Sequence, residues 1–371
     1  MKGQRTDRVG IGVIGCGVIS GAYLTAPKGF PILEIRGLAD MNPAAAEARA
    51  KEFGLKAMRI DALLADPGVE IVLNLTIPKA HVAVGLQALA AGKHVYSEKP
   101  LGVAFKDGKR LIDLAAKKKL RVGSAPDTFL GGAHQTCRRL IDSGKIGTPV
   151  GGTAFFMCPG HERWHPAPDF YYQKGGGPVL DMAPYYVTDL VNLLGPVTRV
   201  QAMTSMPRKT RTITSQPRSG EAIPVEVPTH AAGTLEFVSG ALVQMSMSFD
   251  VPAHRHLPIE IYGSKGTLIV PDPNRFGGAI EYAAERDKWI PLKTELPYAD
   301  GNFRSIGLAD MAHALRSNRP HRASGALALH VLEVMEVFDR SAKSGKAIAI
   351  TTRPERPAPL EESLVRRKLA A

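Results

Sequence analysis

The stretch VGIGVIGCGVIS, residues 9–20, decides the fold of the first third of the chain. Its apolar run Val9–Ile14 is typical of a strand buried on both faces, and Gly15-Cys16-Gly17 leads from it into a helix. In such a turn the first glycine permits the tight bend and the second permits close approach of a pyrophosphate. A small residue three positions later, here Ser20, lets the helix pack on the strand. The helix N-terminus presents backbone N–H groups to the phosphates, so the pattern predicts a dinucleotide-binding turn.

A carboxylate at the end of the next strand supports this prediction. Asp40 follows the predicted strand 32–39 and lies 23 residues after Gly17, where an acidic side chain accepts hydrogen bonds from the adenosine ribose hydroxyls. The next two residues are methionine and asparagine, so no arginine follows to hold a 2′-phosphate, which the carboxylate would also repel. This favours NAD(H) over NADP(H). Asp40 is also placed to cap the helix that begins at Pro43, and the two roles are compatible.

Two kinds of sheet are predicted along the chain. Up to about residue 126, short apolar strands alternate with amphipathic helices, which is typical of a doubly wound parallel α/β sheet. Beyond it the strands are longer and more alternating, as in an α+β domain with a largely antiparallel sheet. The segment 207–228, rich in Ser, Thr, Pro and Arg, is expected to form a long surface loop. The expected organisation is a first domain over 1–126, a second over 127–351 and an extended tail over 352–371.

Composition limits the class of protein. A chain of 371 residues suggests two domains, and 44% hydrophobic with 22% charged residues argues against a disordered or fibrous protein. The three cysteines show no CxxC spacing, so we expect neither a disulfide framework nor a thiolate zinc site, but a reducing, cytoplasmic compartment. The uncharged stretch 9–27 is broken by glycines, which argues against a membrane span or a secretory signal.

The net charge of +12 raises the question of nucleic-acid binding. Its densest clusters lie at 117–119 and 366–368, and neither has interleaved aromatic residues or a zinc-finger-like pattern. The first cluster follows an apolar-periodic helix, where positive side chains suit the C-terminal end of the helix dipole. We therefore expect a solvated helix end and no nucleic-acid site.

A lysine follows the strand predicted at 94–97. Glu98-Lys99-Pro100 lies at the carboxyl end of the sheet, where ligands of open α/β sheets bind. A lysine there can hold a substrate hydroxyl and relay its proton if burial or a nearby charge lowers its pKa. A surface lysine in a turn set by Pro100 explains these residues equally well. Asp127, after the last strand of this domain, either reaches a ligand or caps the following helix.

Polar side chains also mark one helix of the second domain. Asp181, Tyr185 and Asp189 lie four residues apart on the helix predicted at 179–194 and so share one face. Their apolar neighbours suggest that this stripe faces a pocket. A solvated stripe on an amphipathic helix is the simpler explanation when the helix is taken alone.

The segment HERWHPAPDFYY, residues 161–172, precedes that helix and combines aromatic faces with polar edges, as sugar binding requires. An ordered loop with its aromatic residues packed on the core is an equal alternative. His161 and His165 are four residues apart, but the surrounding prolines argue against a helix and no third ligand stands at a suitable spacing. We therefore expect no metal site.

Together, the turn at 15–20, Asp40, Glu98-Lys99-Pro100 and the segment 175–185 resemble the Gfo/Idh/MocA superfamily, named for glucose–fructose oxidoreductase, inositol dehydrogenase and a rhizopine-catabolism protein. The resemblance covers about residues 9–346. It implies an N-terminal Rossmann domain, a C-terminal α+β domain with an open, largely antiparallel sheet, and NAD(P) as the cofactor. It also implies a homo-oligomer, a dimer or tetramer, assembled through that sheet.

The resemblance further implies roles for single residues. Lys99 contacts substrate and relays a proton, and Asp181 orients the substrate. Many members carry a histidine four residues after this aspartate, whereas this chain has Tyr185, so Lys99 and Tyr185 are joint candidates for the proton donor. His81 belongs to the implied cofactor-side loop but is equally compatible with a packed helix residue. The expected cofactor-binding residues are Gly15, Cys16, Gly17, Val18, Ile19, Asp40, Thr76, Pro78, His81, Glu98 and Lys99. The expected substrate-binding residues are Lys99, Trp164, His165, Tyr171, Asp181 and Tyr185.

The sequence therefore predicts an NAD-dependent oxidoreductase, with NADP less expected. It would transfer a hydride between the nicotinamide and a carbinol or carbonyl carbon of a sugar, cyclitol or sugar derivative. Two alternatives stay open: NAD-assisted glycoside cleavage by transient oxidation and elimination, and a non-catalytic dinucleotide-binding sensor. The presence of Lys99, Asp181 and Tyr185 argues against the sensor. No nucleic-acid, membrane or metal partner is expected.

Overall fold

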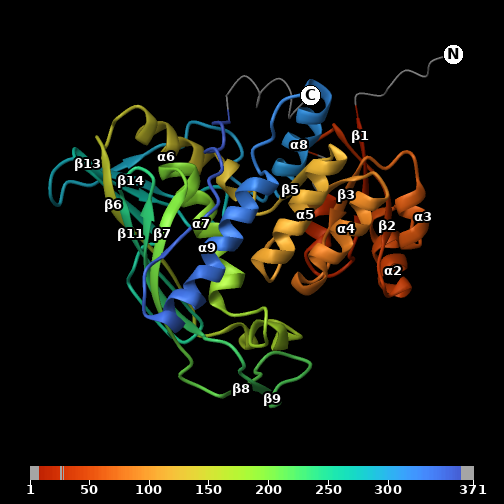
Figure 1. Cartoon of the computed structure of the whole chain (residues 1–371), viewed down its shortest axis with the longest axis horizontal. Coiled ribbons are helices and arrows are strands. Elements are labelled where there is room, and N and C mark those ends of the chain that lie inside the picture. Colours follow the sequence, from red (N-terminus) through yellow and green to blue (C-terminus); the bar gives the residue numbers. More distant parts are fainter. Residues whose placement is uncertain (1–7, 26, 28, 361–371) are drawn as a thin grey trace. The chain divides into compact units, whose positions relative to one another are not determined.

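Strand β1 (Val9–Ile14) is buried along its whole length, as its apolar sequence predicts, and pairs in parallel with a strand on each side. The computed structural model describes residues 8–25, 27 and 29–360 of the chain. Its first sheet has the order β2-β1-β3-β4-β5 with all pairings parallel, which confirms the predicted doubly wound sheet. The other strands are β2 (Leu33–Ala39), β3 (Ile71–Asn74), β4 (His94–Ser97) and β5 (Val122–Ser124). The helices between them are α1 (Ser20–Thr25), α2 (Pro43–Phe53), α3 (Ile60–Ala65), α4 (His81–Ala90) and α5 (Phe105–Lys118). Figure 1 shows this part in red to orange.

The start of α2 shows which residue caps this helix, and the end of α5 shows where the lysine cluster lies. Asn42, and not Asp40, caps α2: its side chain accepts a hydrogen bond from the backbone N–H of Ala44, and Pro43 occupies the first turn. The lysines at the end of α5 are exposed, and Lys119 ends the helix in the left-handed conformation. The cluster at 117–119 is thus a solvated helix end, as expected, whereas the cluster at 366–368 lies outside the described residues.

The second sheet has nine strands in the order β15-β14-β13-β12-β6-β11-β10-β7-β16. Within this sheet only β6 and β11 pair in parallel, and β10 and β11 form an antiparallel hairpin, so the mostly antiparallel second sheet is confirmed. Its strands are β6 (Pro149–Met157), β7 (Val197–Ser205), β10 (His230–Phe237), β11 (Leu242–Ser248), β12 (Ile259–Gly263), β13 (Gly266–Val270), β14 (Ile280–Ala283), β15 (Ile290–Leu292) and β16 (Ile348–Ala349).

Helices cover one face of this sheet. Helix α7 (Pro178–Leu194) packs on β6, β10 and β11, and α6 (Gly132–Asp142) packs on β13 and α7. Helix α9 (Gly325–Ser344) lies on the same face, since Phe338 fills the space beside Gly233. The opposite face exposes large apolar side chains, among them Met203 and Leu242.

The segment 207–228 is not the simple surface loop that its composition suggested. It contains a two-stranded sheet of β8 (Thr210–Thr212) and β9 (Ala222–Pro224). Arg211, Ile213 and Ile223 are buried, because this small hairpin packs its inward-facing side chains on the second unit.

The chain divides into two units whose boundaries differ from the expected ones. The first unit combines residues up to 130 with 300–329 and the described tail residues 357–360, and the second comprises 131–299 and 330–356. Helix α8 (Ile306–Ser317) thus groups with the parallel sheet, although a continuous second domain over 127–351 was expected. Residues 361–371 of the expected tail lie outside the described part of the chain.

Asp127 explains why α8 belongs to the first unit. Its Oδ2 accepts hydrogen bonds from the backbone N–H groups of Ser305 and Gly307, each at 3.0 Å, at the start of α8. Asp127 therefore caps a helix that begins about 180 residues later, and not the helix that follows it. Burial raises the pKa of this carboxyl to about 6, against the opposing effect of the Gly307 hydrogen bond.

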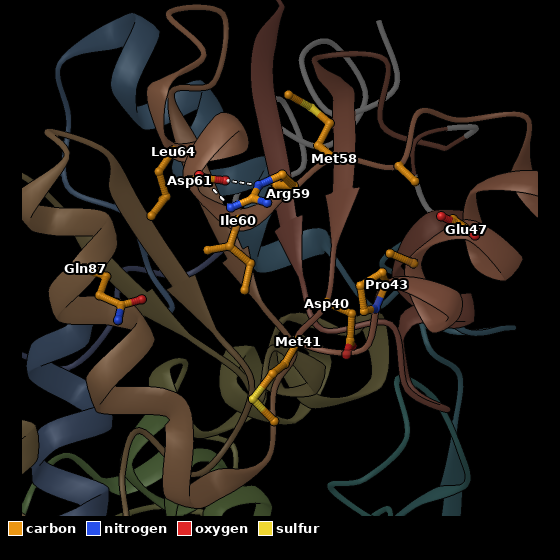
Figure 2. Close-up of a pocket in the computed structure, with 12 residues that line it drawn as sticks. Asp40, Met41, Pro43, Glu47, Met58, Arg59, Ile60, Asp61, Leu64 and Gln87 are labelled. Carbon is orange, nitrogen blue, oxygen red and sulfur yellow. Dashed lines mark hydrogen bonds and ion pairs between the residues drawn. The ribbon is translucent and has the colours of Figure 1, made fainter.

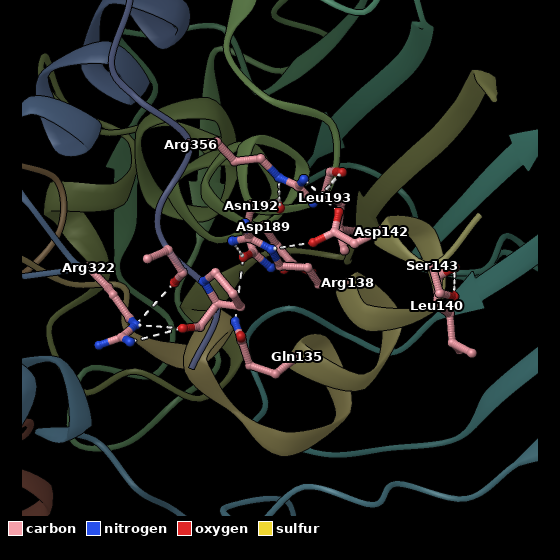
Figure 3. Close-up of polar contacts among 12 residues, drawn as sticks. Gln135, Arg138, Leu140, Asp142, Ser143, Asp189, Asn192, Leu193, Arg322 and Arg356 are labelled. Carbon is pink, nitrogen blue, oxygen red and sulfur yellow. Dashed lines mark hydrogen bonds and ion pairs between the residues drawn. The ribbon is translucent and has the colours of Figure 1, made fainter. Parts of the chain in front are cut away.

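A buried polar network holds α7 in the second unit, and Figure 3 shows the part of it in which Arg138 donates to Asn192 and Asn192 donates to Asp189. Asp189 is fully buried and lies 2.8 Å from Nδ1 of His134, whose Nε2 lies 2.8 Å from the carbonyl oxygen of Arg275. The expectation that Asp189 continues a pocket-facing stripe is wrong, since its partner is a core histidine. Burial opposes protonation of His134, but the Asp189 carboxylate raises its pKa. Figure 3 also shows Arg356, which donates to the carbonyl oxygens of Asn192 and Leu193 at the end of α7.

No helix in the described residues is both long enough and apolar enough to cross a bilayer.

The raised pKa of Asp127 predicts a pH dependence of stability. Because the native state holds this proton more tightly than the unfolded chain, Asp127 makes the free energy of unfolding fall as pH rises from about 4 to about 6. Asp127→Asn removes this dependence because an amide does not titrate in this range. The amide oxygen can still accept both hydrogen bonds, since both go to one oxygen of Asp127. Between about pH 4 and pH 6 we expect the free energy of unfolding of the variant to rise relative to that of wild type by up to about 3 kcal/mol, measured by urea unfolding. Asp107→Asn, at an exposed carboxylate, is the control, and parallel pH profiles for Asp127→Asn and wild type would contradict the prediction.

Candidate active site

The turn after β1 is built on a close backbone approach. Gly15 has φ +107°, and a Cβ there would lie 2.5 Å from the carbonyl carbon of Leu75, directly after β3. Gly17 is exposed, and a Cβ on it would meet no protein atom within 4 Å. The first glycine is therefore required by the fold, whereas the second leaves room for a ligand.

Asp40 joins the ends of β1 and β2. Its Oδ2 accepts a hydrogen bond from the backbone N–H of Cys16 at 2.8 Å, and its Oδ1 accepts one from the N–H of Asn42 at 2.8 Å. Burial, reinforced by the Asp40 charge, raises the pKa of the Cys16 thiol to about 11, so this thiol stays neutral. The carboxylate thus shapes the turn and keeps further lone pairs for ribose hydroxyls.

A pocket of about 800 Å³ opens beside Asp40 (Figure 2). Its charged lining residues are Asp40, Glu47, Arg59 and Asp61, and the Arg59 guanidinium donates to both oxygens of Asp61, at 3.1 and 3.2 Å. Arg59 comes from the start of α3, 19 residues after Asp40, so the two residues that follow Asp40 in the sequence do not reveal it. The pocket lining thus holds three carboxylates and one guanidinium that is already paired with Asp61, and this excess of negative charge disfavours a 2′-phosphate and supports the preference for NAD(H).

Exposed apolar side chains follow three successive strands of the parallel sheet. Val18, Met41 and Ile77 are 78%, 93% and 64% exposed, after β1, β2 and β3 respectively. Since such side chains gain from leaving water, their clustering at strand ends fits a ligand with flat, partly apolar rings. Together with the open space at Gly17, this surface fits a dinucleotide.

The loops after β3 and β4 are held by buried polar side chains. Oδ1 of Asn74 accepts from the backbone N–H and the hydroxyl of Thr76, while the ring nitrogens of His81 lie 2.7 Å from the carbonyl oxygen of Pro100 and 2.8 Å from that of Thr76. His81 is buried and is thus a packed residue that connects these loops. Direct cofactor contacts from Thr76, Pro78 and His81 stay predictions.

The Glu98 carboxylate holds the backbone at Lys99 through a hydrogen bond. Its Oε1 accepts a hydrogen bond from the Tyr23 hydroxyl at 2.6 Å, and its Oε2 accepts one from the backbone N–H of Lys99 at 2.9 Å. Burial and the Glu98 charge raise the pKa of Tyr23, which keeps its proton on the phenol. Lys99 is partly exposed, in keeping with a reacting side chain at the sheet edge.

In the second unit the structure brings the predicted aromatic residues together. The ring centroids of Trp164 and His165 are 5.2 Å apart, and those of His165 and Tyr171 are 5.4 Å apart. Trp164 is 59% exposed, whereas Tyr171 is buried. The segment therefore packs in part on the core, as one alternative expected, while Trp164 stays exposed; sugar binding by this segment stays a prediction.

Asp181 is connected to this aromatic cluster through His161. It lies in the first turn of α7, and its Oδ2 is 3.0 Å from Nε2 of His161. Nδ1 of the same ring accepts a hydrogen bond from the indole N–H of Trp164 at 3.0 Å. Tyr185 is buried one helical turn beyond Asp181.

The hairpin of β8 and β9 anchors the aromatic segment. Buried Arg211 forms ion pairs with Glu162 and Asp250, the former at 2.6 Å, and Glu162 accepts a hydrogen bond from the Tyr172 hydroxyl. The Ser215 hydroxyl donates to the carbonyl oxygen of His165 at 2.6 Å. Pairing of the buried charges ties the segment firmly to the unit, because separating them would leave a charge uncompensated.

Sequence reasoning missed several of these supporting residues. Asn74 had a usable signal, an amide at the end of an otherwise apolar strand. Arg211 and Tyr23 had none, since nothing local indicates that either is buried against an acid. Among the described residues, no three His, Cys, Asp or Glu side chains gather as metal ligands.

Comparison with known proteins identifies the family. Residues 9–125 match the model of an oxidoreductase family with an NAD-binding Rossmann fold, and residues 134–269 match the GFO/IDH/MocA C-terminal domain. The chain belongs to the Gfo/Idh/MocA family. It is 30% identical over 269 residues to a dTDP-3,4-didehydro-2,6-dideoxy-α-D-glucose 3-reductase of Saccharopolyspora spinosa, covering 71% of this chain and 74% of that protein. It is 24% identical over 327 residues to a levoglucosan dehydrogenase of Pseudarthrobacter phenanthrenivorans, covering 80% and 83%.

Solved structures confirm the Gfo/Idh/MocA fold. An NAD-binding oxidoreductase from Klebsiella pneumoniae superposes with a TM-score of 0.82 at 22% identity, over 93% of this chain and all of that chain. A levoglucosan dehydrogenase in complex with NADH and L-sorbose gives 0.81 at 20% identity, over 94% of this chain and all of that chain. The protein is therefore an NAD(P)-dependent dehydrogenase or reductase, and the recognition made from sequence is confirmed.

The two glycines of the turn predict opposite outcomes on substitution. Gly17→Val adds a side chain where no protein atom lies, so we expect the melting temperature to stay within about 2 °C of wild type. The same side chain enters the space assigned to the pyrophosphate, so we expect NADH to bind at least about 10-fold more weakly in a fluorescence titration. Gly15→Ala is the contrasting variant and should lower the melting temperature. Unchanged NADH affinity in Gly17→Val would contradict the assignment.

Proposed function

We propose that this enzyme transfers a hydride between NAD(H) and a carbinol or carbonyl carbon of a sugar, cyclitol or sugar derivative. The observation that carries the proposal is the association, in one chain, of a dinucleotide-binding turn with Lys99 and with the Asp181, Tyr185 and Trp164 set of the second unit. The relatives named above act on sugars or sugar derivatives according to their names, as a reductase and as a dehydrogenase. Because one is named a reductase and the other a dehydrogenase, these names support both oxidation of a carbinol and reduction of a carbonyl.

The dinucleotide supplies the site that accepts or donates the hydride. Gly15, Cys16, Gly17, Val18 and Ile19 would hold its pyrophosphate, and Asp40 the adenosine ribose. The loop residues Thr76, Pro78 and His81, together with Glu98 and Lys99, complete the proposed cofactor contacts.

Lys99 and Tyr185 are the proposed proton carriers. In the oxidative direction the carbinol C–H bond breaks as the hydride leaves, the O–H proton passes to the lysine amine or the tyrosine oxygen, and the carbonyl forms. Asp181 would accept a hydrogen bond from a substrate hydroxyl, while the aromatic group of Trp164, His165 and Tyr171 would pack on the apolar face of the ring.

Neither alternative is favoured. The relatives named above are dehydrogenases or reductases, which gives no support to glycoside cleavage by transient oxidation. A non-catalytic sensor would have no need of Lys99, Asp181 and Tyr185 together. Glycoside cleavage would release free sugar with catalytic NAD⁺ and no accumulation of NADH.

A sugar and cyclitol panel with NADH absorbance as the readout tests the proposal, with NAD⁺ and NADP⁺ run in parallel. Lys99→Met should lower kcat/KM on the best substrate at least about 100-fold, because the proton relay is lost. Tyr185→Phe removes the hydroxyl of the second proposed proton carrier, so its loss of kcat/KM can be compared with that of Lys99→Met. Lys106→Met, at an exposed lysine of α5, is the matched control. No turnover of any substrate, or a strong preference for NADP⁺, would contradict the proposal or its cofactor assignment.

We also propose a homo-oligomer, a dimer or tetramer, assembled through the face of the nine-stranded sheet opposite to its helices. Exposed Met203 on β7 and Leu242 on β11 support this, since such apolar side chains commonly lie in interfaces. Light scattering after size exclusion should give a multiple of the chain mass, and Met203→Glu should lower it. Met41→Glu, at an exposed methionine of the first unit, is the control, and a monomeric wild type would exclude the assembly.

A cytoplasmic location is proposed as well. Cys16, Cys137 and Cys158 are all free thiols, which is typical of a reducing compartment. Cell fractionation with an antibody to the chain tests this.

A further inference from the structure

His161 lies between two residues of the proposed substrate site. Its Nε2 is 3.0 Å from Oδ2 of Asp181, and its Nδ1 is 3.0 Å from the indole Nε1 of Trp164. All three residues belong to the second unit. One imidazole therefore connects the carboxylate proposed to hold a substrate hydroxyl with the exposed aromatic face.

The partners assign the proton on this ring. An indole nitrogen only donates, so Nδ1 of His161 must be the acceptor and carries no hydrogen. In the neutral ring the proton then sits on Nε2, which donates to the carboxylate of Asp181. The Trp164 hydrogen bond thus selects the tautomer that Asp181 requires.

The ring is also fixed in place by packing. Its centroid lies 4.5 Å from that of Tyr171 and 4.5 Å from that of Phe249, and the residue is buried. Its backbone N–H donates to the Tyr172 hydroxyl at 3.1 Å, and that hydroxyl donates to Glu162. A side chain held from both the backbone and the ring can orient a neighbour with little freedom of its own.

We propose that His161 is a positioning residue that orients Asp181 toward the substrate and keeps it in register with Trp164. The inference rests on the proposed function, because it assigns these two residues to one substrate. A ring hydroxyl held by Asp181 and the apolar face of the same ring on Trp164 would then be positioned by a single rigid group. Small losses of such orientation slow catalysis without changing cofactor binding.

His161→Phe tests this directly, since it removes both ring nitrogens and keeps an aromatic ring against Tyr171 and Phe249. We expect kcat/KM on the best substrate to fall about 10- to 100-fold, with the Kd for NADH within about 2-fold of wild type. His161→Gln restores a donor and an acceptor and should recover part of the loss. His254→Phe, at an exposed histidine of the same unit, is the control.

A double-mutant cycle separates positioning from a structural role. If His161 acts through Asp181, the double variant His161→Phe with Asp181→Asn should be no slower than Asp181→Asn alone. Additive losses would overturn the proposal.

Nitrogen-15 spectra of histidine-labelled protein at neutral pH, assigned by the signal missing in His161→Gln, should show a proton on Nε2 of His161. A proton on Nδ1 would overturn the proposal whatever the activities are.

The outcomes also separate the two proposals. If wild type turns over a substrate and His161→Phe does so equally well, the role of His161 is overturned and the proposed function is retained. Absence of turnover by wild type across the panel would contradict the proposed function, and with it the positioning role.

Discussion

The backbone of Gly15 passes so close to Leu75 that no side chain fits between them, and the cofactor edge of the parallel sheet depends on this approach. A Cβ at Gly15 would lie 2.5 Å from a backbone carbon, so the turn after β1 can meet the end of β3 only through glycine. Asp40 closes the other side by accepting the N–H of Cys16. Three strand ends are thereby drawn together by one close backbone approach and one hydrogen bond to a side chain, and Gly17 is left open toward the space proposed for the dinucleotide.

In the second unit, buried charges hold the aromatic segment. Arg211 is nearly inaccessible and pairs with Glu162 and Asp250, so the hairpin that carries it cannot separate from the segment at 161–172 without exposing unpaired charges to an apolar core. Glu162 is adjacent to His161, which contacts Asp181. The segment 207–228 is thus connected to the proposed substrate residues through the ion pair of Arg211 with Glu162, which is the neighbour of His161 in the chain.

Much of this architecture could be predicted because it depends on local patterns. Continuous apolar runs indicated the parallel strands, alternation indicated the second sheet, and the glycine turn with Asp40 indicated the dinucleotide. The grouping of α8 with the first unit, the burial of Asp189 and the hairpin at 207–228 could not be predicted. Each depends on a partner far along the chain: Asp127 pairs with backbone groups about 180 residues later, and Asp189 pairs with a histidine 55 residues earlier.

The sequence by itself determined the class of the protein, the cofactor turn and the family to which the chain belongs, because glycine conformation and strand periodicity are properties of neighbouring residues. The tertiary structure decided which polar side chains are buried and what each one pairs with. His161 illustrates the reason: in the sequence it is one of two histidines four residues apart in a proline-containing segment, and only its position between an indole N–H and a carboxylate assigns its proton. A buried polar group takes its role from its partners, and those partners are brought to it by the fold.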